Sequence, residues 1–431
     1  MDLTLIIFVV TFVVLMAVGM PVAYAVGLTA VVVTAFADFS LDGLVITIFH
    51  STDNVNLLTI PFFVFAGAIM AEGGMARRLV DFAGLFVGWI RGGLSLVNIL
   101  ASTLFGAISG SSVADTASIG SVLIPEMERK GYPRSFGAVL TASASVQAIL
   151  VPPSHNSVLF AIVANTAAVT IPAMFLAGII PTLVLCLTLI VMCLIAARKN
   201  NYPKEARVEL KRKIKIASDA IWGLVTIVII SGGILSGFFT PTESGAIACI
   251  WAMFVTFFVY REYKLKDFPK LIHRTIKTVT MVMVLIAFAA AFGSVMTLVG
   301  LPQEISAALL SLSDNKYVIL LIINIMLLLL GCLMDMAPLI LILTPVLLPV
   351  TNALGIDPVH FGMIMLVNLG IGLITPPVGS VLFVASAVSK QKIEQVVKAM
   401  LPFYAVLFLV LMLVTYIPEI SLFLPKFFGV M

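Results

Sequence analysis

Two stretches of the chain, 221 residues apart at their first glycines, carry the same order of glycine, aspartate and proline residues. Each has a glycine, an aspartate four or five residues later, and a Pro-Pro pair 21 residues after a second glycine. The residues are Gly110, Asp115, Gly131 and Pro152-Pro153 in the first copy, and Gly331, Asp335, Gly355 and Pro376-Pro377 in the second. Apolar helices interrupted at matching places in two halves of a chain are the best sequence indication of a transporter binding site.

The composition is that of a membrane protein. Hydrophobic residues make up 61% of the chain and charged residues 11%, and the apolar runs are long enough to span a bilayer repeatedly. Residues 1–20 lack the basic start and cleavage site of a signal peptide, so we expect a first membrane helix there. Four cysteines without CxxC spacing are expected to pack as small apolar residues: Cys186, Cys193, Cys249 and Cys332. We predict an all-α polytopic membrane protein, with no indication of nucleic-acid binding.

The basic residues indicate the orientation in the membrane. Of 25 Lys and Arg, 23 fall in five clusters, which the positive-inside rule places in the cytoplasm. The clusters are residues 77–91, 129–134, 198–215, 261–277 and 390–398. The turns expected on the opposite side contain a single basic residue, Lys316. Those turns are residues 37–40, 165–172, 239–241, 313–316 and 353–359.

The same counting predicts two re-entrant hairpins, at residues 94–125 and 317–351, that enter the membrane from opposite sides. The runs at 136–163 and 360–388 are expected to be single spans broken by their Pro-Pro pairs. Two inverted-topology repeats follow, residues 1–197 and 219–431, joined by a cytoplasmic linker at 198–218. This gives about ten spans, with both termini outside the cytoplasm. Amphipathic segments at 76–89 and 301–312 would lie along the interface before each hairpin.

Interrupted helices expose backbone polar groups, which lipid cannot satisfy, so the breaks should face a protected polar cavity. Carbonyl and hydroxyl oxygens at such breaks can replace the hydration shell of a small cation such as Na⁺. Half-helix N-termini beside them favour an anion between the hairpin tips. The candidate sodium ligands are Ser109, Gly110, Ser112, Val151 and Pro153 at one break, and Gly331, Asp335, Ala337, Thr375, Pro376 and Gly379 at the other.

The order of these motifs over residues 4–425 resembles the large membrane subunit of tripartite ATP-independent periplasmic (TRAP) transporters. The motifs are Gly110 to Ala117, Ile124-Pro125, Gly131-Tyr132, Pro152 to Ser154, Thr240 to Gly245, Asp335 to Pro338, Leu343 to Pro345 and Gly372 to Gly379. The resemblance implies Na⁺-driven uptake of an organic acid anion by an elevator motion of a transport domain against a scaffold. It also implies a bacterial inner membrane location with periplasmic termini. The implied partners are a small four-helix membrane subunit and a periplasmic substrate-binding protein.

Candidate substrate ligands are Ser111, Ser112, Asp115, Ser154, His155, Asn156 and Asp335. An ionisable residue inside a membrane segment is a functional candidate by default, which favours Asp335. Each polar candidate has a structural alternative. Asp335, Asp115 and the two serines could cap a half-helix, and His155 and Asn156 could make structural hydrogen bonds. Glu243, in the Thr-Pro-Thr-Glu turn, is expected to be a capping residue.

Other classes fit the residues less well. The chain contains no Gly-Lys pair, so it has no nucleotide-binding loop, and we expect neither a nucleotide nor a transition metal as cofactor. Asp335 and Ser109 lack the sequence settings of intramembrane proteases, so no enzyme activity is expected. A channel, or a standalone divalent-anion/sodium symporter of related hairpin architecture, stays an alternative. No arginine lies in either hairpin tip or helix break, so the substrate stays open among sugar acids, sialic acid and C4-dicarboxylates.

Overall fold

The computed structural model describes residues 3–204, 209–313 and 315–431, and every regular element in these ranges is a helix. Three parts of the predicted topology lie outside the described residues. They are residues 1–2 of the first repeat, 205–208 of the linker and 314 of the turn at 313–316. Within the described ranges, the all-α prediction is confirmed.

The two halves of the chain contain the same order of helices. The first half comprises α1 (Leu3–Ala17), α2 (Val22–Phe36), α3 (Leu41–Thr52), α4 (Thr59–Glu72), α5 (Met75–Val87), α6 (Gly93–Ser109), α7 (Ser112–Arg129), α8 (Arg134–Ser145), α9 (Gln147–Leu150), α10 (His155–Ala164) and α11 (Ile171–Lys199). The second comprises α12 (Leu210–Ile227), α13 (Gly233–Leu235), α14 (Pro241–Phe254), α15 (Phe268–Leu298), α16 (Leu301–Leu312), α17 (Lys316–Gly331), α18 (Met336–Ala353), α19 (Pro358–Gly372), α20 (Ser380–Ser389), α21 (Ile393–Tyr416) and α22 (Glu419–Phe427). The continuous α15 stands where the first half has α3, a short 3₁₀ turn (Val55–Leu58) and α4.

The helices end where glycine and proline interrupt the apolar runs. Gly19, with φ of 84°, separates α1 from α2. Before α14, the Thr240 hydroxyl accepts a hydrogen bond from the Glu243 backbone, and the Glu243 carboxylate accepts one from the Thr240 N–H. This capping box confirms the predicted role of Glu243. Both Pro-Pro pairs lie in breaks, and the chain bends by 44° between α8–α9 and α10.

The predicted linker at 198–218 includes parts of two helices. α11 continues through Lys199, and α12 begins at Leu210. Leu210, Ile214 and Ala217 recur at helical spacing, so the basic run 211–215 lies on a helix.

The number of membrane spans stays a prediction. Among the described residues, seven helical segments are long and apolar enough to cross a bilayer, or eight if the bent pair of α8–α9 and α10 is one span. The shorter apolar helices are α1, α2, α6, α17, α19 and α20. The ten predicted spans count α1 and α2 as crossings, although each has 15 residues.

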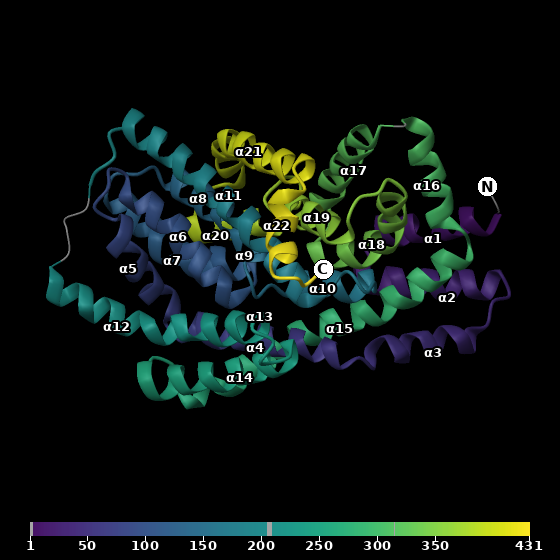
Figure 1. The fold of residues 1–431 in the computed structure, drawn as a ribbon, viewed down its shortest axis with the longest axis horizontal. Coiled ribbons are helices and arrows are strands. Elements are labelled where there is room, and N and C mark those ends of the chain that lie inside the picture. The colour runs from purple at the N-terminus through teal and green to yellow at the C-terminus, as the bar shows by residue number, and fades with distance from the viewer. Residues whose placement is uncertain (1–2, 205–208, 314) are drawn as a thin grey trace.

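The helices pack in two groups. In the scaffold group, α4 packs on α14, and α15 packs on α2, α3 and α4. In the hairpin group, α6 and α7 pack on α8, and α17 packs on α19. Figure 1 shows the scaffold group along the lower edge of the molecule and the hairpin group above it. Helix α5 contacts α6 of the hairpin group and also α12. The two groups touch directly as well, α4 on α6 and α15 on α18.

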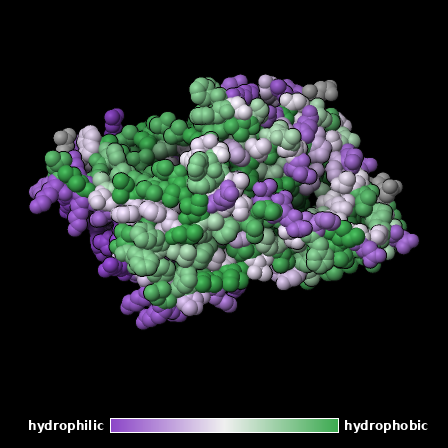
Figure 2. Space-filling model, turned by 60° about the horizontal axis from the view of Figure 1, so that its bottom comes forward, coloured by the Kyte–Doolittle hydropathy of each residue, from purple (hydrophilic) through white to green (hydrophobic). Residues whose placement is uncertain are grey.

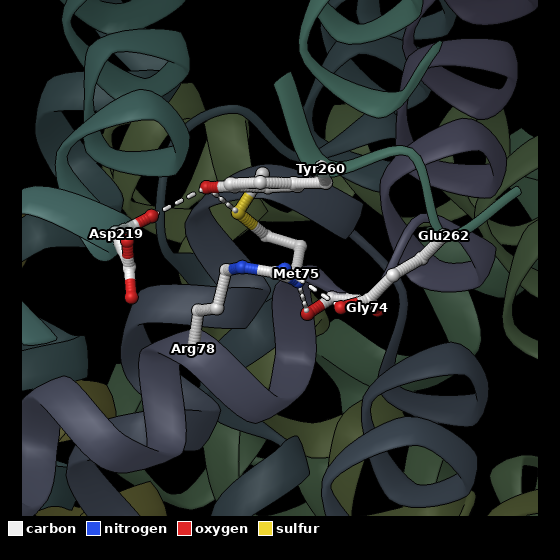
Figure 3. Close-up of polar contacts among 6 residues, drawn as sticks. All are labelled: Gly74, Met75, Arg78, Asp219, Tyr260 and Glu262. Atoms are coloured by element: carbon white, nitrogen blue, oxygen red, sulfur yellow. Dashed lines mark hydrogen bonds and ion pairs between the residues drawn. The ribbon is translucent and has the colours of Figure 1, made fainter. Parts of the chain in front are cut away.

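Arg78, near the start of α5, contacts residues at and just after the end of the π-helical turn (Val255–Tyr260) that follows α14 (Figure 3). Its guanidinium lies 3.7 Å from the centre of the Tyr260 ring, and its Nη2 lies 2.7 Å from Glu262 Oε1. Nη1 donates to the Gly74 carbonyl at 2.8 Å. The Tyr260 hydroxyl donates in turn to the Asp219 carbonyl of α12 at 2.7 Å. The turn between α4 and α5 is thereby held against α12 and against this π-helical turn.

The surface agrees with a protein embedded in a bilayer. Figure 2 shows hydrophobic residues over much of one face, with hydrophilic residues gathered at its left end and along its lower left edge and scattered over its right half. The left end is where Figure 1 places α5 and the start of α12, and the right end is where it places the α2–α3 turn. These are segments that the sequence predicts on opposite sides of the membrane.

Candidate functional site

A cavity of about 410 Å³ lies where the two hairpins meet. One wall is the turn between α6 and α7, and another is the turn between α17 and α18. The start of α10 and two scaffold helices, α4 and α15, complete it. The structure therefore brings the two repeated segments to one place.

The first hairpin tip is built by a glycine and three serines. Gly110, with φ of 59°, ends α6 in the left-handed conformation that reverses the chain. The Ser111 hydroxyl caps α7 by accepting from the Ala114 N–H at 3.3 Å, so the capping alternative for this serine is confirmed. The Ser112 hydroxyl is 2.6 Å from that of Ser145. Ser109, Ser111 and Ser112 all line the cavity, so capping does not remove Ser111 from it.

The first tip packs directly on the first Pro-Pro break. A Cβ atom on Gly110 would lie 2.8 Å from the Pro153 carbonyl oxygen, so a larger residue would not fit. Ser154 caps α10 by accepting from the Ser157 N–H at 3.4 Å, and it is fully buried. Val151 is the C-cap residue of α9 and precedes Pro153 by two residues. Of the candidate sodium ligands at this break, the structure thus places Gly110 against Pro153.

The second tip presents a carboxylate to the cavity. Asp335 caps α18, its Oδ1 accepting from the Met336 N–H at 3.0 Å, and it is exposed. Asp335 and Ala337 both line the cavity. Asp335 thus caps a helix and also lines the cavity, and its contact with a substrate or an ion stays a prediction.

The second tip also packs on its break. The Val378 N–H donates to the Cys332 carbonyl at 3.0 Å. Beside a Cβ position on Gly379 lie the carbonyl oxygens of Thr375, at 2.8 Å, and Leu373, at 3.1 Å. The candidates Gly331, Thr375, Pro376 and Gly379 are not among the residues that line the cavity. These four candidate sodium ligands therefore do not face the cavity.

His155 and Asn156, the first two residues of α10, line the cavity, whereas Ser154 does not. The His155 backbone nitrogen lies 3.4 Å from where a Cβ atom on Gly110 would stand, so the start of α10 touches the first tip.

Asp115 occupies a different environment from Asp335. It is fully buried beside Ser102 and is not among the cavity-lining residues. The residues of α7 that line the cavity are Ser112, Val113, Ala114 and Ala117. Successive helical residues are rotated by about 100°, so the side of α7 that carries Asp115 faces away from the cavity. A substrate role for Asp115 stays a prediction, and the structure does not place it with the other candidates.

Sequence reasoning missed the scaffold wall of the cavity. Arg274 and Thr278 of α15 and Glu72 at the end of α4 line it, and Arg274 Nη1 lies 3.0 Å from Glu72 Oε1. Tyr263 also interacts with Glu72, and its partial burial together with that carboxylate raises the pKa of Tyr263 to about 12. In the sequence Arg274 is one of six basic residues at 261–277. Which of them reaches the cavity depends on how α15 packs on α4.

The arrangement suits an anion accompanied by a hard cation. The first residues of α7, α10 and α18 line the cavity, so three helix N-termini direct partial positive charge and N–H groups into it. The carbonyl and hydroxyl oxygens at the two tip–break contacts are groups that can take the place of a cation's hydration shell.

The chain matches, over residues 9–420, the family model described as the tripartite ATP-independent periplasmic transporter, DctM component. It is 44% identical over 400 residues to the C4-dicarboxylate TRAP transporter large permease protein DctM of Pseudomonas aeruginosa, covering 93% of each chain. It is 40% identical to the sialic acid TRAP transporter large permease protein SiaM of Vibrio cholerae, covering 87% of each. It is 36% identical to the 2,3-diketo-L-gulonate TRAP transporter large permease protein YiaN of Escherichia coli, covering 94% of this chain and 95% of that one.

The fold is similar to that of a solved transporter, YdaH of Alcanivorax borkumensis. The TM-score is 0.60 and the alignment covers 86% of each chain, at 17% sequence identity. At that identity the likeness supports the fold alone.

Proposed function

The chain belongs to the DctM component family of tripartite ATP-independent periplasmic transporters, and from that membership we propose that it imports a small organic acid anion together with Na⁺. The observation that carries this proposal is the convergence of three helix N-termini and Asp335 on one cavity. N-terminal N–H groups bind carboxylates, and a nearby carboxylate attracts the cation that offsets the substrate's charge.

The substrate class follows from the relatives. Their names cover C4-dicarboxylates, sialic acid and 2,3-diketo-L-gulonate, all of which are small organic acids. A C4-dicarboxylate is the first compound to test, because the Pseudomonas relative with that name shares 44% of its residues over nearly the whole chain.

Sodium coupling is supported by the two contacts between tips and breaks. At the first contact the Pro153 carbonyl oxygen lies beside Gly110, and at the second break the carbonyl oxygens of Thr375 and Leu373 lie beside Gly379. A Na⁺ ion bound at such a contact would hold a tip against its broken helix, and so link ion binding to closure of the site.

The two packing groups support an elevator motion, in which the hairpin group slides against the scaffold group. The family description implies a periplasmic binding protein that delivers the substrate, a small membrane subunit as third partner, and a location in the bacterial inner membrane. As a transporter subunit the chain would move its substrate unchanged and would not act as an enzyme.

The decisive experiment uses proteoliposomes that hold this chain, its small subunit and the cognate binding protein. Uptake of labelled succinate or N-acetylneuraminate should require an inward Na⁺ gradient and should not respond to ATP. Equal uptake with K⁺ alone would contradict sodium coupling. Omitting the binding protein distinguishes the alternative, a standalone divalent-anion symporter, which would transport at the same rate without it.

A further inference from the structure

Arg274 places a positive charge on the scaffold wall of a cavity whose hairpin wall carries Asp335. It belongs to α15, which packs on α2, α3 and α4 in the scaffold group. Among the residues that line the cavity, Arg274 is the one arginine, and no lysine accompanies it.

Most of the hydrogen-bond donors of the Arg274 guanidinium have no partner among the described residues. Among the described residues its one hydrogen-bond partner is Glu72, through Nη1 at 3.0 Å, and its side chain is 78% exposed. A guanidinium has five N–H donors in a fixed fork that matches a carboxylate. An exposed ion pair of this kind contributes little to stability, so a ligand can replace Glu72 at small cost.

A second polar group supports a ligand at this wall. Thr275 follows Arg274 and lines the same cavity, it is 7% exposed, and its hydroxyl is buried with no hydrogen-bond partner among the described residues. Buried hydroxyls are normally hydrogen-bonded, so this hydroxyl has a hydrogen bond to offer to a carboxylate at the cavity wall.

The charges in the cavity direct the anionic end of a substrate to this wall. Asp335 repels an anion from the second tip unless a cation lies between them, whereas Arg274 attracts it. An acid that spans the cavity therefore has its carboxylate favoured near α15.

We propose that Arg274, assisted by the Thr275 hydroxyl, binds a carboxylate of the transported anion, and that Glu72 holds the guanidinium while the cavity is empty. This inference rests on the proposed function and adds a substrate contact on the scaffold side. It requires opposite effects from the two members of the ion pair. Removing Arg274 weakens binding, while removing the competing Glu72 carboxylate strengthens it.

The test is a thermal-shift titration of the purified large and small subunits in Na⁺ buffer, without the binding protein. The probes are succinate and N-acetylneuraminate, each compared with its carboxamide, and the concentration dependence of the midpoint gives Kd. Arg274→Gln should raise Kd for the acids about 10-fold or more, since a charge-assisted hydrogen bond is lost. It should therefore also lower the acid-over-amide preference, which is the Kd of each carboxamide divided by the Kd of its acid. Arg274→Lys should restore part of that preference. Glu72→Gln should lower Kd for the acids.

Lys270→Gln is the matched control, because it removes a positive charge one turn away on α15, where Lys270 pairs with Asp267 outside the cavity. It should leave Kd unchanged. Equal weakening by Arg274→Gln and Glu72→Gln, with the acid-over-amide preference unaltered, would show that the ion pair is only structural and overturn the inference. A wild-type complex that neither acid stabilises would overturn it as well. The proposed function is judged separately, by Na⁺-dependent uptake in proteoliposomes.

Discussion

A Cβ atom added to Gly372 would lie 2.7 Å from the carbonyl carbon of Gly331. The end of α17 therefore touches the end of α19 backbone to backbone, at the place where the second hairpin turns and the broken helix stops. The first copy has the corresponding contact between Gly110 and Pro153.

Gly372→Ala should lower the free energy of unfolding by about 1–3 kcal/mol, because overpacking a backbone contact forces the two helices apart. The measurement is the thermal midpoint of the purified protein, alongside transport. Gly293→Ala in α15 is the control, since a Cβ there meets nothing within 4 Å. Helical alanine is favoured over glycine by about 0.5–1 kcal/mol, so this variant should be neutral or slightly stabilised. An unchanged midpoint in Gly372→Ala would contradict the tight contact.

Asp335→Asn should reduce transport at least about 10-fold while leaving the fold intact, because asparagine caps a helix as well as aspartate but carries no charge. Uptake and the unfolding midpoint are measured on the same preparation. Asp357→Asn makes the same substitution at another helix cap, where Oδ1 accepts from the Val359 N–H at 2.8 Å outside the cavity. It should transport normally. Normal uptake by Asp335→Asn would mean that the residue is only a cap.

Arg78→Lys should slow transport about threefold with little change in KM, because lysine loses the stacking on Tyr260 and the forked contact with Glu262, a loss of about 0.5–2 kcal/mol. The predicted effect is on the motion of the hairpin group, to which α5 is joined through α6. Arg77→Lys, at the exposed neighbouring position, should have no effect. A change in KM alone would argue against a mechanical role for this contact.

The predicted orientation can be tested with single cysteines. Ser313→Cys should react with an impermeant maleimide added to intact cells, whereas Lys211→Cys should react only after permeabilisation. The four native cysteines are buried, so their background should be low. Labelling of Lys211→Cys in intact cells would contradict the inverted topology.

The breaks in the helices could be predicted from sequence because glycine and proline act locally. Gly110, Gly131 and the Pro-Pro pairs interrupt apolar runs whatever surrounds them, and helices end beside each of them in the structure. The basic run at 211–215 conceals the apolar spacing of Leu210 and Ile214, which belongs to α12.

Which side chains face the cavity could not be predicted in the same way. Asp115 and Asp335 stand five and four residues after their glycines, yet one is fully buried and the other exposed. Asp335 is the N-cap of α18, whereas Asp115 lies four residues past the N-cap Ser111, inside α7. Arg274 reaches the cavity through the packing of α15 on α4, a contact between residues about 200 apart in the chain that no local pattern encodes.

The position of Arg274 on the scaffold has a thermodynamic consequence for the proposed elevator cycle. The hairpin residues travel with their cargo, while an arginine on α15 stays where it is, so its contact with the cargo exists in only one of the two end states. A ligand shifts the populations of two states by the difference in its affinity for them. The cargo would therefore itself bias the resting distribution toward the state described here, and Arg274→Gln would remove that bias even if transport continued.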